Sequence, residues 1–192
     1  MGTLLDERFL EQPAFAMERC KKVAMTMAET AKQGFFDAMS LLDEYDEKTA
    51  RKVYQKEEEV DHYEDELGSY LVKLSSKNLS QQDAETLSMI LHSFSDFERI
   101  SDHARSIVKS ADEIHEKGLA FSKNAKDEIE VLSEVIRDVC NMTTESFCDQ
   151  DLKQALHVEP LERAVDSLTK RIKEHHIKRL QKGKCTIEMG FI

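Results

Sequence analysis

The chain has 192 residues, enough for one large domain or two small ones, and a formal net charge of −11. This charge argues against a nucleic-acid partner, because binding to a phosphate backbone depends on clustered Lys and Arg, and it suits cations or a basic protein surface instead. Two prolines, six glycines and no tryptophan favour long helices over sheets, and no stretch approaches the ~20 apolar residues that cross a bilayer.

The first two predicted helices share a regular apolar stripe. One runs from Pro13 to about residue 42, the acidic segment 43–46 interrupts the pattern, and the next runs from about residue 47 to residue 75. Apolar residues spaced three or four apart, or seven apart, indicate the faces that turn inward. These residues are Ala16, Cys20, Val23, Met27, Ala31 and Phe35 in the first helix, and Val53, Val60, Leu67, Leu71 and Leu74 in the second.

The third predicted helix runs from about residue 81 to residue 117. Ser80 and Asp83 form an N-terminal capping pattern, since a serine hydroxyl accepts a hydrogen bond from a free backbone N–H of the first turn. Gly118 is a suitable stop, because glycine adopts the left-handed conformation that ends many helices.

Two more helices are predicted in the rest of the chain. The fourth runs from residue 123 to about residue 148, with Ser122 as its cap. The fifth runs from about residue 151 to residue 182 and stops at Gly183, and Pro160 is expected to break its early part.

A weak internal repeat suggests two domains. A shift of 105 residues places Glu57, Val60, Asp61 and Leu67 over Glu162, Val165, Asp166 and Ile172. We therefore predict a first three-helix bundle over residues 1–118 and a second over residues 119–192. The second lacks its third helix, so we expect the sequence to be part of a longer protein, or the missing helix to come from a second copy in a homodimer.

The spacing Glu-x-x-x-Asp recurs along the chain, and three of the pairs that have it are candidate metal ligands. This spacing puts both carboxylates of a pair on one helix face, one turn apart. With 38 acidic residues in the chain, a single pair is more often a solvated helix flank, but recurrence at matching repeat positions favours a repeated site for hard cations. The pairs are Glu57/Asp61, Glu98/Asp102 and Glu162/Asp166.

The pairs are expected at the rim of the apolar faces. At 100° per residue, Glu57 lies about 60° and Asp61 about 100° from the stripe through Val60. Glu98 and Asp102 lie roughly 100–140° from the stripe of their own helix. A rim position would leave the carboxylates solvated and ionised, and able to meet acids of a neighbouring helix across a metal.

Other chemistry has little support in the sequence. His103 follows Asp102 and would be a ligand, a partner of a ligand or a surface residue. No phosphate loop or nucleophile–base pair is evident. The four cysteines form no C-x-x-C pair and indicate reduced thiols in a cytosolic protein.

The run Glu98-Arg99-Ile100-Ser101-Asp102-His103-Ala104-Arg105-Ser106-Ile107 resembles the signature of PhoU domains, with Ser101 at a position where the family has glycine and Ser106 where it has asparagine. Glu57 and Asp61 resemble the paired motif on the preceding helix. The likeness is closest to the PhoU domains fused to the C-terminus of bacterial Na/Pi cotransporters. Residues 5–10 and 176–188 are similar to segments of those proteins.

The resemblance implies an all-α fold of two antiparallel three-helix bundles, the second incomplete here, each with a multinuclear metal site. Glu57, Asp61, Glu98 and Asp102 would form the first site, and Glu162 and Asp166 half of the second. The family implies regulation of phosphate uptake or signalling, without catalysis.

The expected setting is cytoplasmic, tethered to the inner face of the membrane through a parent phosphate transporter, whose presence would explain the abrupt start near Leu4. An oxygen-only ligand set does not choose among Fe, Zn, Mn and Mg. Two alternatives stay open: a carboxylate-bridged metal enzyme, and a metal-free helical scaffold for a basic partner.

Overall fold

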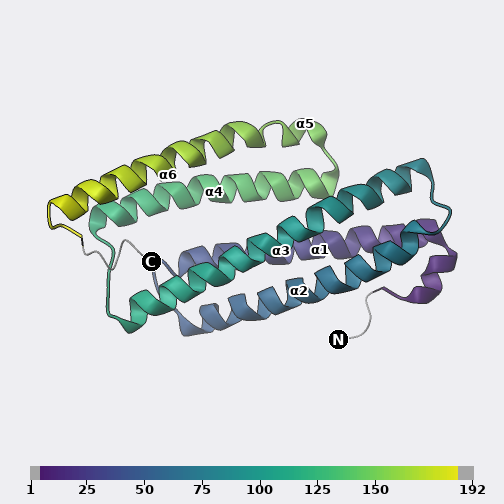
Figure 1. Ribbon diagram of the computed structural model, residues 1–192, viewed down its shortest axis with the longest axis horizontal. Helices are drawn as coiled ribbons and strands as arrows, with labels where there is room; N and C mark the ends of the chain where they lie inside the picture. The colour runs from purple at the N-terminus through teal and green to yellow at the C-terminus, as the bar shows by residue number, and fades with distance from the viewer. Residues whose placement is uncertain (1–4, 186–192) are drawn as a thin grey trace. The chain divides into compact units, whose positions relative to one another are not determined.

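A computed structural model of the chain describes residues 5–185, and every regular element in that range is helical. The predicted all-α class is confirmed. Figure 1 shows the elements, which are the 3-10 helix η1 (Glu7–Glu11) and the helices α1 (Pro13–Ser40), α2 (Glu47–Ser75), α3 (Gln81–Glu116), α4 (Lys123–Asp149), α5 (Leu152–Ala155) and α6 (Val158–Gln181). Two expectations from the sequence concern residues outside this range: the similarity of residues 186–188 to segments of the cotransporters, and the abrupt start near residue 4.

The chain divides into two compact units, each described here by itself. The first contains the residues through Asp37 together with Lys48–Arg105, and the second contains Ala38–Glu47 together with the residues from Ser106 onward. Both α1 and α3 therefore run from one unit into the other. The sequence-based boundary between residues 118 and 119 stays a prediction.

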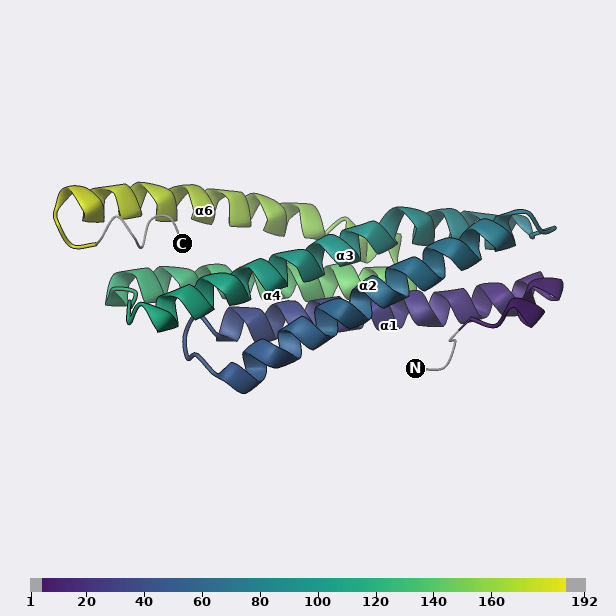
Figure 2. The same ribbon diagram turned by 60° about the horizontal axis from the view of Figure 1, so that its bottom comes forward.

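The core of the first unit follows the predicted apolar stripes. There α1, α2 and the first part of α3 lie side by side (Figures 1 and 2). Every stripe residue predicted on α1 and α2 is buried except Phe35, which is half-buried. From α3, Phe97 and Ala104 are buried as well. Burying a Leu or Val side chain contributes about 1.5–3 kcal/mol, so this core is the main source of the unit's stability.

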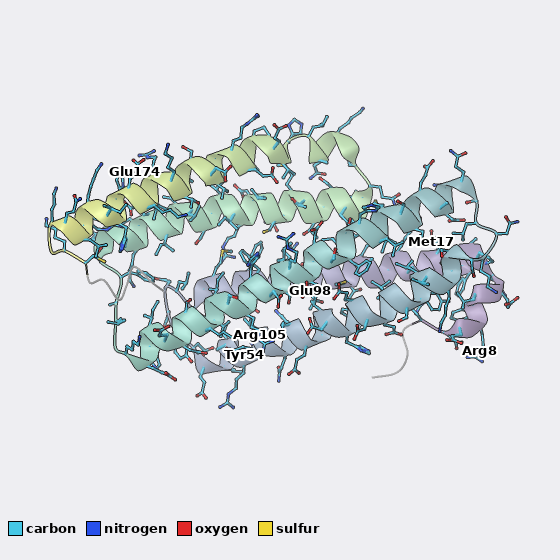
Figure 3. The ribbon with its side chains drawn as sticks, in the orientation of Figure 1. Arg8, Met17, Tyr54, Glu98, Arg105 and Glu174 are labelled. Atoms are coloured by element: carbon cyan, nitrogen blue, oxygen red, sulfur yellow. The ribbon has the colours of Figure 1, made fainter. Side chains whose placement is uncertain are left out.

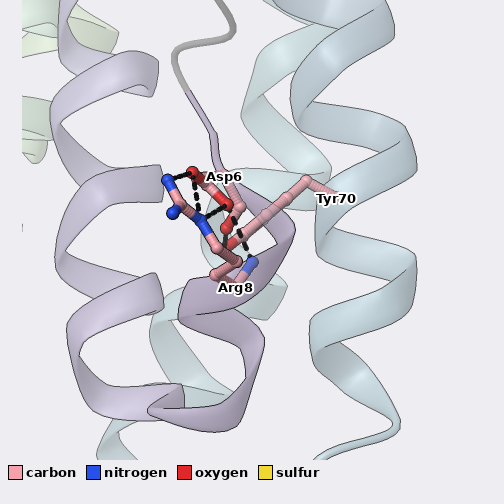
Figure 4. Close-up of polar contacts among 3 residues, drawn as sticks. All are labelled: Asp6, Arg8 and Tyr70. Carbon is pink, nitrogen blue, oxygen red and sulfur yellow. Dashed lines mark hydrogen bonds and ion pairs between the residues drawn. The ribbon is translucent and has the colours of Figure 1, made fainter.

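Polar contacts tie the segment before α1 to α2. Asp6 caps η1 by accepting a hydrogen bond from the backbone N–H of Arg8 at 2.9 Å, and the hydroxyl of Tyr70 donates to the carbonyl of Asp6 at 2.9 Å (Figure 4). The backbone N–H of Leu5 donates to Oε1 of Glu66 at 3.0 Å. The hydrogen bonds from Arg8 lower the pKa of Asp6 to about 2. The N-terminal segment is therefore anchored to α2.

Helix ends agree with the predicted caps. The hydroxyl of Ser80 accepts a hydrogen bond from the N–H of Asp83 at 3.1 Å, and that of Ser122 accepts one from Ala125 at 3.3 Å. Gly118 has a φ of 61°, the left-handed conformation that glycine adopts without steric cost. None of the helices in the described range is long and apolar enough to cross a membrane.

The second unit contains the antiparallel helices α4 and α6, with the short α5 between them (Figure 1). The predicted helix over 151–182 is broken at residues 156–157, so Pro160 lies in the first turn of α6, where its missing N–H leaves no hydrogen bond unmade. Although α6 is amphipathic, none of its residues is fully buried. The apolar face of α6 is therefore covered less completely than the apolar face of α2 in the first unit.

Candidate metal centre on α2 and α3

Helical periodicity brings acidic side chains together across α2 and α3. Asp61 and Glu64 are three residues apart on α2, and Glu98 and Asp102 are four apart on α3, so each pair shares one helix face. We call these four residues the acidic cluster. Figure 3 labels Glu98 on α3 where this helix runs beside α2. The structure thus brings together three of the predicted ligands, Asp61, Glu98 and Asp102.

The carboxylates of the acidic cluster act on one another electrostatically. Partial burial, and then the charges of Glu57 and Asp102, raise the pKa of Asp61. Partial burial, and then the charges of Asp102 and Glu64 with a hydrogen bond to Asp102, raise the pKa of Glu98. Because each shift disfavours the ionised form, the cluster holds negative charge that water does not fully screen.

Glu57 is placed differently from the rest of its predicted set. Its side chain is buried, with 4% of the residue exposed, and Nη1 of Arg105 donates a hydrogen bond to its Oε1. The prediction that Glu57 is a solvated rim residue is therefore wrong. The helix-wheel angle was measured on α2 alone, and the packing of α3 covers that side of α2.

The donor chemistry of the acidic cluster suits a hard cation, since all of its ligand atoms are carboxylate oxygens. The placement of those atoms is less suitable. Over residues 5–185, no three His, Cys, Asp or Glu side chains are grouped so that they would hold a metal ion. A bound ion would therefore have to draw the carboxylates of α2 and α3 closer together, and the metal site stays a prediction.

The other predicted ligands and the histidines considered with them are not members of the acidic cluster. Glu162 and Asp166 are exposed on α6, one turn apart, and belong to the second unit. His103 is exposed on α3. His175 contacts Glu128 of α4, with 2.6 Å between Nδ1 and Oε1.

Sequence reasoning missed two residues of this region. Glu64 contributes to the raised pKa of Glu98, and its spacing of seven residues from Glu57 was the signal that would have included it. Arg105, which pairs with Glu57, lies seven residues after Glu98 on the same helix (Figure 3). It lies within the run that resembles the signature, so a search for cations near the acids would have found it.

The sequence of the chain is similar to known proteins over the helices that carry the acidic cluster. The chain is similar to the phosphate-specific transport system accessory protein PhoU homolog of Clostridium acetobutylicum, with 23% identity over 159 residues that make up 81% of this chain and 71% of the relative. No solved structure matches the chain with significance. A family model described as the PhoU domain matches residues 24–111. The segment that carries Glu57 and the acidic cluster therefore matches the PhoU domain family, in agreement with the resemblance of its signature.

Proposed function

We propose that this chain is a regulatory, non-catalytic domain that modulates phosphate uptake or phosphate signalling and does so with metal ions bound to the acidic cluster. The match of residues 24–111 to the PhoU domain and the similarity to a PhoU homolog named as a transport accessory protein support the regulatory part. The matched segment runs from within α1 to within α3 and includes the whole acidic cluster, so the family match and the candidate metal centre concern the same helices.

One observation carries the metal part of the proposal. The charge of Asp102 on α3 raises the pKa of both Asp61 on α2 and Glu98 on α3, and a multivalent cation would offset that repulsion. These three residues would hold the ion, with Glu64 as a further ligand. The metal, one or more ions of Fe, Zn, Mn or Mg, would join the helices and would supply positive charge that attracts phosphate.

The proposed setting is the cytoplasmic side of a membrane phosphate transporter. The transporter would be either a separate partner or an upstream part of the same protein, as in the Na/Pi cotransporters whose terminal PhoU domains the sequence resembles. In either arrangement the domain would act by changing its contact with the transporter. Such a change fits an accessory role and needs no chemical step in the domain.

Phosphate uptake in cells that lack the gene for this chain tests the proposal. Reintroducing the wild-type chain should restore the regulation of uptake by external phosphate, and the Glu98→Ala/Asp102→Ala variant should not. The matched control is Glu18→Ala/Glu29→Ala, which removes two exposed carboxylates of α1 that lie in local pairs with Lys21 and Lys32. Full regulation by the Glu98/Asp102 variant at an equal protein level would contradict the proposal.

A second candidate function is a metal-free scaffold that binds a basic partner. It is favoured by the placement of Glu57, which already has a cation, Arg105, beside it. In this alternative the acidic cluster would meet lysine or arginine side chains of the partner protein. Regulation that survives depletion of divalent metal but is lost at high salt would favour the scaffold over the metal site.

A further inference from the structure

A cavity of about 910 Å³ opens in the second unit where α4 begins and α6 ends. Its walls are the loop 118–122, the first turns of α4, the last turns of α6 and residues 183–185. Figures 1 and 2 both show the start of α4 beside the end of α6. Binding sites for small molecules measure about 300–1,000 Å³, so this cavity has the size of a ligand site.

Most of the cavity wall is apolar. The large apolar side chains that line it come from the loop and from both helices, and are those of Leu119, Phe121, Ile129, Ile172 and Ile177. Ile177 remains 53% exposed, and α6 buries none of its residues fully. Since an apolar body would remove this surface from water, its binding here would be favourable.

The charged side chains that line the cavity are all basic. Lys173, Arg179 and Lys184 line it, and no Asp or Glu does among the described lining residues. This grouping is notable in a chain with a net charge of −11. The positive charge of Arg179 is partly neutralised by Glu128, because Nη1 of Arg179 donates a hydrogen bond to Oε2 of Glu128 at 2.8 Å. Lys173 and Lys184 supply the remaining positive potential.

Two buried nitrogen atoms of the lining residues lack a partner. Nε of Arg179 and Nε2 of His176 are both buried and have no hydrogen-bond partner among the described residues. Nδ1 of His176 lies 3.7 Å from Sγ of Cys185. Nε of Arg179 is a donor, and Nε2 of His176 is a donor in the tautomer in which Nδ1 accepts from the thiol. Buried donors are rarely left unsatisfied, but neither nitrogen has surface open to the cavity, so an anionic oxygen would satisfy them only if these side chains moved.

We propose that this cavity binds an amphipathic anion, a ligand with a carboxylate or phosphate head group and an apolar body. The head group would interact with the ammonium groups of Lys173 and Lys184, and the body would lie against the isoleucine and phenylalanine side chains. The lining residues of this site all belong to the second unit, and none of them is a member of the acidic cluster. It goes beyond the proposed function and does not depend on it.

Fluorescence titration of the full chain with 1-anilinonaphthalene-8-sulfonate, an amphipathic anion, tests the proposal. We expect saturable binding of one probe per chain and displacement by octanoate or octyl phosphate, whichever head group the site prefers. Lys173→Glu/Lys184→Glu should weaken probe binding about tenfold. Lys178→Glu/Lys182→Glu, which makes the same charge change at residues outside the lining, should stay within about twofold of wild type.

Each competitor and control has an outcome that would overturn the proposal. Equal weakening in the two charge variants would show only a general electrostatic effect. Displacement by octanol as effective as that by octanoate and octyl phosphate would show a purely apolar site, and displacement by inorganic phosphate alone would show a phosphate site without a role for the apolar wall. The absence of saturable probe binding to the wild-type chain would overturn the proposal. Circular dichroism of the variants tests whether weaker probe binding results from a loss of folding.

Discussion

Arg105 of α3 donates a hydrogen bond to the carboxylate of Glu57 on α2, and this carboxylate is buried, with only 5% of its side chain exposed. The pair joins two helices at residues 48 positions apart in the sequence. It also places a positive charge beside the acidic cluster, where it lowers the cost of ionising Asp61. The packing of α2 on α3 and the electrostatics of the candidate metal centre therefore depend on the same contact.

Removing Arg105 should destabilise the fold. Arg105→Ala leaves the carboxylate of Glu57 buried without its partner, so we expect the free energy of unfolding to fall, with water compensating part of the loss because 44% of the Arg105 side chain is exposed. Denaturation in urea measures this change. The added substitution Glu57→Gln should recover part of the loss, because it removes the unpaired charge. Additive losses in the double variant would contradict the pairing.

The raised pKa of Glu98 gives a prediction for stability against pH. The pKa of Glu98 is higher in the folded chain than its ordinary value of 4.5, so the folded chain binds more protons than the unfolded chain between these two pKa values. The free energy of unfolding therefore falls as pH rises through this range. Glu98→Gln should therefore stabilise the metal-free chain at pH 7, by less than about 1 kcal/mol for this partly exposed group. The difference should vanish below pH 4.

Melting temperatures in the presence of a chelator, measured from pH 4 to pH 8, check this prediction. Glu18→Gln is the matched control, because Glu18 is an exposed acid that is paired with Lys21 on the same helix. A Glu98→Gln variant that is less stable than wild type at pH 7, or a gain that persists unchanged at pH 4, would contradict the electrostatic account of the acidic cluster.

The repeat-related residues Leu67 and Ile172 should differ in their contribution to stability. Leu67 is fully buried in the first unit, whereas Ile172 is half-buried on α6. Leu67→Ala should lower the free energy of unfolding by about 3 kcal/mol, in the range measured for buried leucines, and Ile172→Ala by about 1 kcal/mol. Chemical denaturation of the two variants gives the comparison. Equal losses would show that the second unit is packed as fully as the first.

The helices were predictable because their signals are local. The period of the stripes on α1 and α2, the serine caps and the left-handed glycines at residues 118 and 183 all depend on neighbours within one or two turns. The break before Pro160 followed from the chemistry of proline in the same way.

The candidate site was predictable only in part. The signature run indicated Glu98 and Asp102, but the burial of Glu57 depends on a partner 48 residues away and on how far α3 covers α2. No angle measured on a single helix contains that information. The cavity at the end of α6 was missed for the same reason, because its walls come from a loop, two helices and the residues after Gly183.

The metal content of the chain purified without chelator tests the central claim most directly. Elemental analysis should find at least one Fe, Zn, Mn or Mg ion per wild-type chain and the same amount in the Glu18→Ala/Glu29→Ala control. The Glu98→Ala/Asp102→Ala variant should lose the metal, because two of the proposed carboxylate ligands are gone. Equal metal content in the variant and the wild type, or none in either, would contradict the claim that the acidic cluster holds a metal.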